Sequence, residues 1–155
     1  MDQISFKGCF GCGPTNDSGL KAVFRTMEDG RVEGVFVAGQ QHIGYPDSVH
    51  VGPLVGFLSE TMGRLAFPKN LYYLTHSIQV TFKSAVSPGV KIRAFATLKR
   101  MHGHHLVAEA KMYGPGGQLI AEAEGKYSLS ERPTIKKWVG KSAQAEKPSS
   151  GSLED

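Results

Sequence analysis

Residues 42–67 read HIGYPDSVHVGPLVGFLSETMGRLAF, a turn-rich segment followed by a mostly apolar one. Glycine, proline and aspartate interrupt any regular element in the first half. The second half has the apolar spacing of a buried helix, which we expect to begin near Pro53 and to end at Phe67, because Pro68 cannot continue it. The first N–H groups of a helix have no intrahelical acceptor and favour negative charge. This loop and helix start are therefore the candidate active site.

Strand-like alternation of apolar and polar residues flanks this helix on both sides. Two short strands joined by a turn at Gly30 precede it, and four longer strands follow. Strands with one apolar face are typical of an antiparallel sheet covered on one side. The order predicts an α+β fold, in which one antiparallel sheet of about six strands wraps around a central buried helix. A single helix covers such a sheet and its edges poorly, so we expect dimerisation.

Length and composition indicate one domain, because 155 residues with 40% hydrophobic content suffice for one core. Residues 1–17 are rich in glycine and cysteine and are predicted to form an ordered N-terminal loop. Residues 18–130 carry the strands and the helix. Residues 131–155 are polar and hold little that could pack, so we predict a flexible C-terminal tail.

Charge and hydropathy exclude several classes of partner. No apolar run approaches 18 residues, and the first residues lack a secretory signal, so we expect a cytoplasmic protein without a membrane partner. The formal net charge of +4 suits an anionic ligand, such as a phosphate-bearing cofactor. It falls short of the basic stripe of a nucleic-acid-binding protein, and no nucleic acid is expected.

The cysteines Cys9 and Cys12 form a single C-x-x-C motif. Such a motif is a metal half-site, a redox pair or two packed thiols. A tetrahedral zinc site needs four ligands, so we expect structural thiols and no metal, although a site shared across a dimer or completed by histidines stays open. A redox pair is disfavoured, because Gly13 and Pro14 follow where a helix would be needed.

Three features together resemble one family. They are CFGCGPTNDSGL at residues 9–20, the H-x-G-Y-P-x-x-V-H loop at residues 42–50, and the helix that follows. Their joint spacing resembles the hotdog-fold acyl-CoA thioesterases of the phenylacetate-pathway (PaaI-like) type, over about residues 8–128. The resemblance implies a homodimer or homotetramer with the acyl-CoA substrate in a groove between subunits. It implies no cofactor beyond the coenzyme A of the substrate, and no metal.

The resemblance also assigns roles to particular residues. In the family, the backbone N–H after the loop histidine polarises the thioester carbonyl, and an acidic residue nine positions after that histidine acts as base or nucleophile. Carried over, His50, the Val51 amide and Gly52 keep the oxyanion half of the site, with Val51 replacing a family glycine. Ser59 occupies the acidic position, and Glu60 is the only carboxylate nearby.

Helix geometry limits what Glu60 can do, because one residue of displacement rotates a side chain by about 100°. Ser59 lies in line with small residues of the helix, whereas Glu60 shares a face with Arg64. An exposed intrahelical pair of Glu60 and Arg64, worth about 0.2–0.5 kcal/mol, is the structural alternative to a catalytic role. Thr75 matches a family Ser or Thr that helps to position water or the carboxylate, or is an ordinary strand hydroxyl.

The leading hypothesis is hydrolysis of an acyl-CoA thioester, with Glu60 or a Ser59-bound water in place of the usual base. The alternative is a catalytically weak or inactive protein that binds acyl-CoA. A hotdog dehydratase or hydratase is a third class, disfavoured because the spacing from His42 or His50 to an acid does not match. The sequence does not specify the acyl chain.

Overall fold

The computed structural model describes residues 5–132 and residue 135. The flexible tail predicted for residues 131–155 falls almost wholly outside these described residues. Within them, no helix has the length and apolar character needed to cross a membrane. The cytoplasmic location stays a prediction from the sequence.

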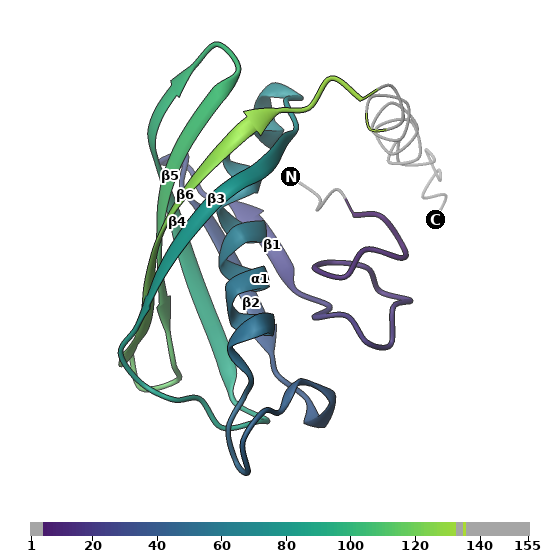
Figure 1. The fold of residues 1–155 in the computed structure, drawn as a ribbon, viewed down its shortest axis with the longest axis vertical. Coiled ribbons are helices and arrows are strands. Elements are labelled where there is room, and N and C mark those ends of the chain that lie inside the picture. The colour runs from purple at the N-terminus through teal and green to yellow at the C-terminus, as the bar shows by residue number, and fades with distance from the viewer. Residues whose placement is uncertain (1–4, 133–134, 136–155) are drawn as a thin grey trace, which may run out of the picture.

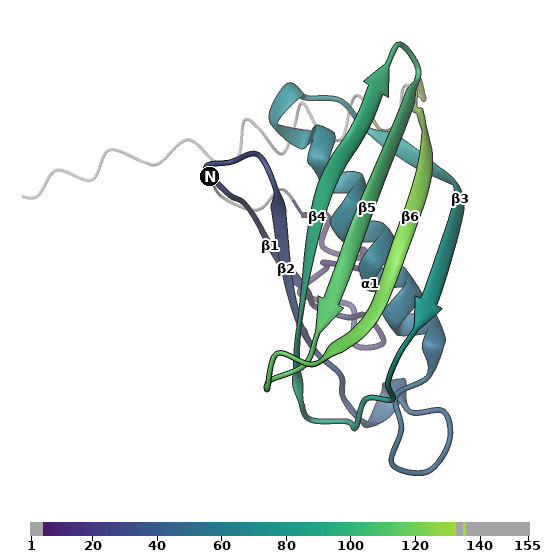
Figure 2. The ribbon, with the colours of Figure 1, turned by 90° about the vertical axis from the view of Figure 1, so that its left-hand side faces the viewer.

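A six-stranded antiparallel sheet in the order β1-β2-β4-β5-β6-β3 curves around one long helix, α1 (Figures 1 and 2). The predicted α+β arrangement is therefore confirmed. Helix α1 lies on one face of the sheet and contacts strands from β2 across to β3. The bounds are β1 Val23–Thr26, β2 Val32–Val37, α1 Val51–Gly63, β3 Tyr73–Phe82, β4 Lys91–His102, β5 His105–Tyr113 and β6 Leu119–Leu129.

Period-two alternation places the core on the helix side of the sheet. In β5, Leu106 and Met112 are fully buried, whereas Glu109 and Lys111 between them are exposed. Alanines occupy the other buried positions, and Ala110 pairs with an alanine of β6. These small side chains leave room for the bulky residues of α1, which supply much of the core volume.

Helix α1 approaches β2 closely because β2 contains a glycine. A Cβ on Gly34 would lie 2.8 Å from the Thr61 hydroxyl and 2.9 Å from the Phe57 ring, so any larger residue would displace the helix. Phe57 is fully buried, and its ring centroid lies 5.3 Å from that of Phe36. This contact fixes the central turns of α1 against β2.

The bounds of α1 differ from the prediction at both ends. The helix begins at Val51, two residues before Pro53, because a proline is tolerated throughout the first turn, where N–H groups lack intrahelical acceptors. It ends at Gly63 and continues as a 3-10 helix over Arg64–Lys69, so the predicted end at Phe67 is wrong. That segment contains Pro68 and ends at Lys69, and its C-cap residue, Asn70, is in the left-handed region.

Strand β3 forms one edge of the sheet and is the least covered of the long strands. The one-sided burial expected for it is incomplete, since Ile78 and Val80 are only half-buried. Leu74 and Phe82 are exposed. An exposed edge of ten residues presents unpaired backbone groups, which proteins usually cover. The expected dimer stays a prediction.

Candidate active site

His50 caps the start of α1. Its backbone is extended, with φ −64° and ψ 145°, and its Nδ1 accepts a hydrogen bond from the Gly52 N–H at 2.9 Å. The Gly52 N–H is therefore occupied. Among the described residues, no group accepts from the Val51 N–H, and the Val51 side chain is 50% exposed. Val51 has the ordinary helical φ, so replacing the family glycine causes no backbone strain. This amide is the open donor at the helix start.

The loop that carries His50 is held by its own hydrogen bonds. The His50 N–H donates to the His42 carbonyl at 2.8 Å, and the Gly44 N–H donates to the Ser48 carbonyl at 2.9 Å. Ile43 and Val49 form an isolated antiparallel bridge between these bonds. His50 therefore enters α1 from a small closed hairpin, which fixes the position of the helix start.

Ser59 and Thr75 are brought together by the fold. Their hydroxyl oxygens lie 2.8 Å apart and form a hydrogen bond from α1 to the edge strand β3. The Ser59 carbonyl accepts a further bond from the Tyr127 hydroxyl at 3.0 Å. Burial raises the pKa of Tyr127 to about 12, so this hydroxyl keeps its proton and stays a donor. The hydroxyl pair thus stands at the edge of the sheet, and its catalytic role stays a prediction.

Glu60 faces a different environment from Ser59. Its Oε1 accepts a hydrogen bond from Arg64 Nη2 at 2.9 Å, the pairing that the sequence suggested as its structural role. The Arg64 side chain is only 6% exposed, and its guanidinium carbon lies 4.2 Å from the Phe24 ring centroid and 5.0 Å from that of Phe67. Glu60 therefore belongs to a largely buried charge pair, about 100° around α1 from Ser59.

The N-terminal loop covers that side of α1. The sulfurs of Cys9 and Cys12 and a carboxylate oxygen of Glu60 all lie within 4.8 Å of one another. A hydrogen bond from Cys12 lowers the pKa of the Cys9 thiol to about 6, and the same bond together with burial raises the pKa of Cys12. Sequence reasoning missed this cluster, because no local pattern shows which helix face a distant loop will cover.

The two halves of the predicted site are separated along the helix. Val51 and Ser59 are eight positions apart, which corresponds to about 12 Å of helix length. An oxyanion donor must lie about 3 Å from the carbonyl oxygen, and a base or its bound water must reach the adjacent carbon. The Val51 amide and the Ser59 hydroxyl of one chain therefore do not serve the same thioester.

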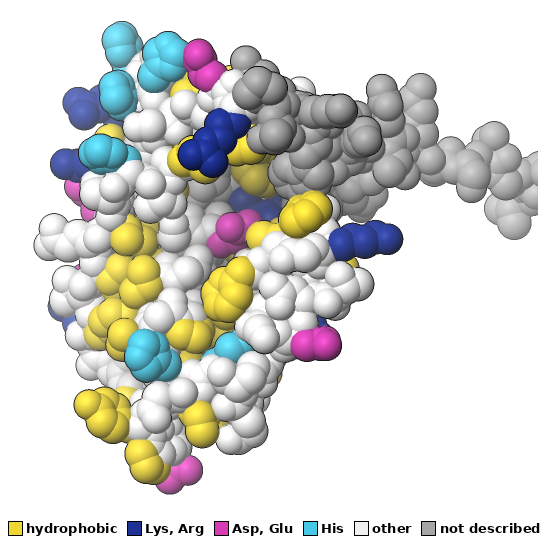
Figure 3. Space-filling view, turned by 45° about the vertical axis from the view of Figure 1, so that its right-hand side comes forward, with side chains coloured by type: hydrophobic (Ala, Val, Ile, Leu, Met, Phe, Trp, Pro, Cys, Tyr) yellow, Lys and Arg dark blue, Asp and Glu magenta, His cyan; other side chains and the backbone are white. Residues whose placement is uncertain are grey.

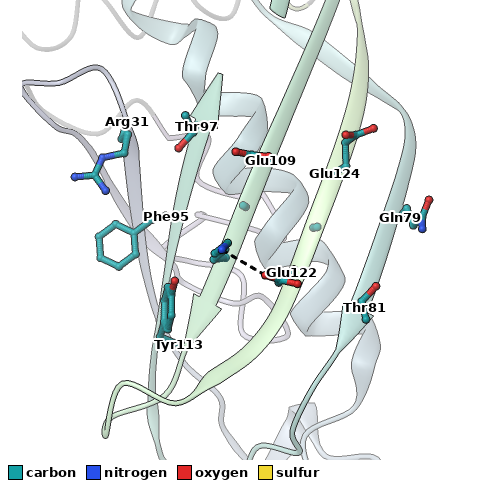
Figure 4. Close-up of a pocket in the computed structure, with 12 residues that line it drawn as sticks. Arg31, Gln79, Thr81, Phe95, Thr97, Glu109, Tyr113, Glu122 and Glu124 are labelled. Carbon is teal, nitrogen blue, oxygen red and sulfur yellow. Dashed lines mark ion pairs between the residues drawn. The ribbon is translucent and has the colours of Figure 1, made fainter. Parts of the chain in front are cut away.

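A separate hollow of about 630 Å³ lies on the outer face of the sheet (Figure 4). The side chains labelled in Figure 4 point away from α1, and most are polar or charged, including Glu109, Glu124 and the Glu122 of the Lys111–Glu122 ion pair at 3.4 Å. None of the predicted site residues lines it. We therefore place the candidate site at α1 and β3, not in this hollow.

Comparison with known proteins identifies the fold. No family model matches the chain, and no curated protein matches it. Among solved structures, the PaaI protein from the Escherichia coli phenylacetic acid degradation operon aligns with a TM-score of 0.66 and 15% identity, over 72% of this chain and 80% of that one. A thioesterase superfamily protein aligns with a TM-score of 0.72 and 18% identity, over 79% of this chain and 60% of that one.

A hypothetical thioesterase from Streptococcus pneumoniae, solved with coenzyme A, aligns with a TM-score of 0.65 and 14% identity, over 70% of this chain and 88% of that one. Two alanine variants of that protein are also similar; one replaces an aspartate and the other a threonine sixteen positions later. Identities at this level establish the fold alone. The hotdog fold that the sequence resemblance implies is thereby confirmed.

Proposed function

We propose that this protein binds an acyl-CoA thioester and hydrolyses it slowly, through a site that lacks the usual catalytic carboxylate. The observation that carries the proposal is the hydrogen bond between the Ser59 and Thr75 hydroxyls at the edge of the sheet. These residues are sixteen positions apart, the same separation as the aspartate and threonine replaced in the pneumococcal thioesterase. This shared separation supports our inference that Ser59 takes the place of that aspartate.

This chain has a backbone donor suited to stabilise the oxyanion of the proposed reaction. A thioester carbonyl gains negative charge as water attacks, and a fixed N–H donor at a helix N-terminus stabilises that charge. The open Val51 amide supplies such a donor, and the bond between His50 and Gly52 keeps it in place. Removal of one such donor in other hydrolases lowers kcat by about 10²–10³-fold.

The proposed site lacks a strong general base, because Ser59 replaces the usual carboxylate. An ordinary serine hydroxyl does not take a proton from water at neutral pH, so the Ser59–Thr75 pair supports catalysis by holding water in position. Of the two substitutes expected from the sequence, we favour this bound water over Glu60, since the Glu60 carboxylate is paired with Arg64 on another side of the helix. A positioned general base contributes about 10²–10⁴-fold, which is the deficit we expect here.

A second copy of the chain completes the proposed site. The Val51 amide of one chain cannot act on the same carbonyl as Ser59 of that chain, so we propose that each thioester lies between two subunits. Exposed hydrophobic residues at the loop and at the edge strand support such pairing, including Tyr45, Val51, Leu74 and Phe82. Hydrophobic side chains also gather on the face seen in Figure 3. We propose a homodimer, which could pair again into a tetramer.

The test measures release of coenzyme A from a panel of short, long and aromatic acyl-CoA substrates. We expect slow turnover by the parent and an increase in kcat of about 10²-fold or more in Ser59→Asp, because a carboxylate beside Thr75 supplies the missing base. Ser59→Asn is the matched control, since it has similar size and no base, and it should give no increase. No gain in Ser59→Asp would overturn the assignment of this position.

A non-catalytic acyl-CoA-binding protein is the second candidate, favoured by the absence of a carboxylate at position 59. Calorimetry with a non-hydrolysable acyl-CoA analogue separates the two functions. Binding by the parent with no turnover above the uncatalysed rate, together with turnover in Ser59→Asp, identifies the binding protein. Loss of a real parent activity in Glu60→Ala, with binding of the analogue unchanged, would instead restore Glu60 as the base.

A further inference from the structure

The N-terminal loop and α1 together assemble three metal-binding side chains. Cys9 and Cys12 come from the loop and Glu60 from the helix, with one ligand atom of each within 4.8 Å of the others. In Figure 1 the loop lies beside α1 on the side away from the sheet. Donor atoms around a tetrahedral zinc ion lie roughly 3.3–3.8 Å apart, given its bond lengths to sulfur and oxygen, so small side-chain rotations close the cluster.

The loop turns tightly after Cys9. The Gly13 N–H donates to the Cys9 carbonyl at 2.9 Å. A Cβ on Gly13 would lie 2.4 Å from the Lys7 carbonyl oxygen, so this tight turn requires glycine. The turn lies between the two cysteines and the rest of the chain, and both sulfurs are close to the Glu60 carboxylate.

The charges of the cluster balance around a divalent cation. Two thiolates and one carboxylate carry three negative charges, and the Arg64 guanidinium at Glu60 Oε1 neutralises one of them. A divalent ion would neutralise the other two. The second carboxylate oxygen, Oε2, is the one nearer the loop, 3.2 Å from where a Gly11 Cβ would stand. Glu60 is therefore able to bridge Arg64 and a metal ion.

We propose that Cys9, Cys12 and Glu60 bind one thiophilic divalent cation of the Zn²⁺ class, with the fourth position taken by water or by a donor from a second chain. Thiolate ligands select zinc over magnesium or calcium. The site goes beyond the proposed hydrolysis, because Glu60 lies about 100° around α1 from Ser59, which bonds Thr75, and the proposed reaction does not use it. Its role is to fasten the N-terminal loop to the helix.

The test uses the full chain, stripped of metal by a chelator in reducing buffer and titrated with Co²⁺. We expect one Co²⁺ per chain, with the sulfur-to-cobalt charge-transfer band and intense d–d bands of a tetrahedral thiolate site, and displacement by Zn²⁺. Cys9→Ser and Cys12→Ser should each weaken the charge-transfer band, and the double variant should abolish it. Glu60→Gln should keep the band and weaken affinity by about tenfold or more, because losing a ligand costs at least as much as losing an outer partner of a ligand.

A triple variant of the exposed turn histidines, His102→Ala, His104→Ala and His105→Ala, is the matched control and should bind Co²⁺ like the parent. Circular dichroism checks that each variant is folded, and Zn²⁺ should raise the Tm of the parent but not of Cys9→Ser. Three results would overturn the site: no stoichiometric binding, binding that depends on the histidines, or a stable Cys9–Cys12 disulfide in place of metal. None of these measurements depends on acyl-CoA, so they stand apart from the hydrolysis test.

Discussion

Ser59 and Glu60 are adjacent in α1, yet they meet different parts of the molecule. Ser59 shares a hydrogen bond with Thr75 at the uncovered edge of the sheet. Glu60 pairs with Arg64 and faces Cys9 and Cys12 of the N-terminal loop. A step of about 100° around the helix therefore separates a hydroxyl pair open to a partner or ligand from a packed charge pair. The Glu60 carboxylate is therefore not positioned to replace a carboxylate at position 59.

The largest stability effect should come from the Glu60 side. Arg64→Ala removes a largely buried side chain that pairs with Glu60 and stacks on two aromatic rings. We expect the free energy of unfolding to fall by about 3 kcal/mol, measured by urea denaturation. Arg100→Ala, at an exposed position in β4, is the control and should change it by less than about 0.5 kcal/mol. Equal losses in both variants would mean that the buried pair contributes little.

Glu60→Gln separates a structural from a catalytic role at the same residue. The amide keeps the shape but loses the charge that faces Arg64, so we expect a loss of about 1 kcal/mol of unfolding free energy and an unchanged kcat. Glu28→Gln, at an exposed turn position, is the control for a lost charge. A decrease in kcat of about 10²-fold or more, without loss of stability, would show that Glu60 is catalytic and would contradict its structural assignment.

At the helix start, His50→Ala removes the side chain that caps α1. We expect a loss of about 1 kcal/mol of unfolding free energy, typical of a lost N-cap, and a lower kcat because the Val51 amide is less well fixed. His102→Ala, at an exposed position in the β4–β5 turn, should change neither quantity. An unchanged kcat in His50→Ala would show that His50 has no role in the proposed reaction.

The smallest effect on stability should come from removing the hydroxyl that bonds Ser59. Thr75→Val removes one exposed hydroxyl from β3, and we expect the unfolding free energy to change by less than about 0.5 kcal/mol. In the Ser59→Asp background the same change should lower kcat about tenfold, because the new carboxylate loses a hydrogen-bond donor. Thr81→Val, elsewhere on β3, is the matched control and should leave kcat unaltered. If Thr75→Val and Thr81→Val gave the same kcat, Thr75 would have no role beyond that of an ordinary strand residue.

Periodicity predicted the fold well, because β4, β5 and β6 alternate buried and exposed residues over most of their length and the helix is mostly apolar. It failed at the helix ends. The helix was predicted to begin near Pro53 and to end at Phe67 before Pro68, but Pro53 lies inside α1 and Pro68 lies inside the 3-10 helix that follows. Family spacing located Ser59 and Thr75, which the structure joins by a hydrogen bond. The contact of Glu60 with the cysteines was beyond sequence reasoning, because it depends on how an irregular loop packs against a distant helix.

The Tyr127 hydroxyl that binds the Ser59 carbonyl has a mechanical consequence. This bond joins the middle of α1 to the strand next to the edge, and the ring that carries it is almost fully buried. Sliding of the helix along the sheet would break the bond and withdraw the ring from the core. The bond and the buried ring therefore hold the helix against the sheet, and under the proposed function acyl chains of different length would be accommodated at the edge strand and the loops instead.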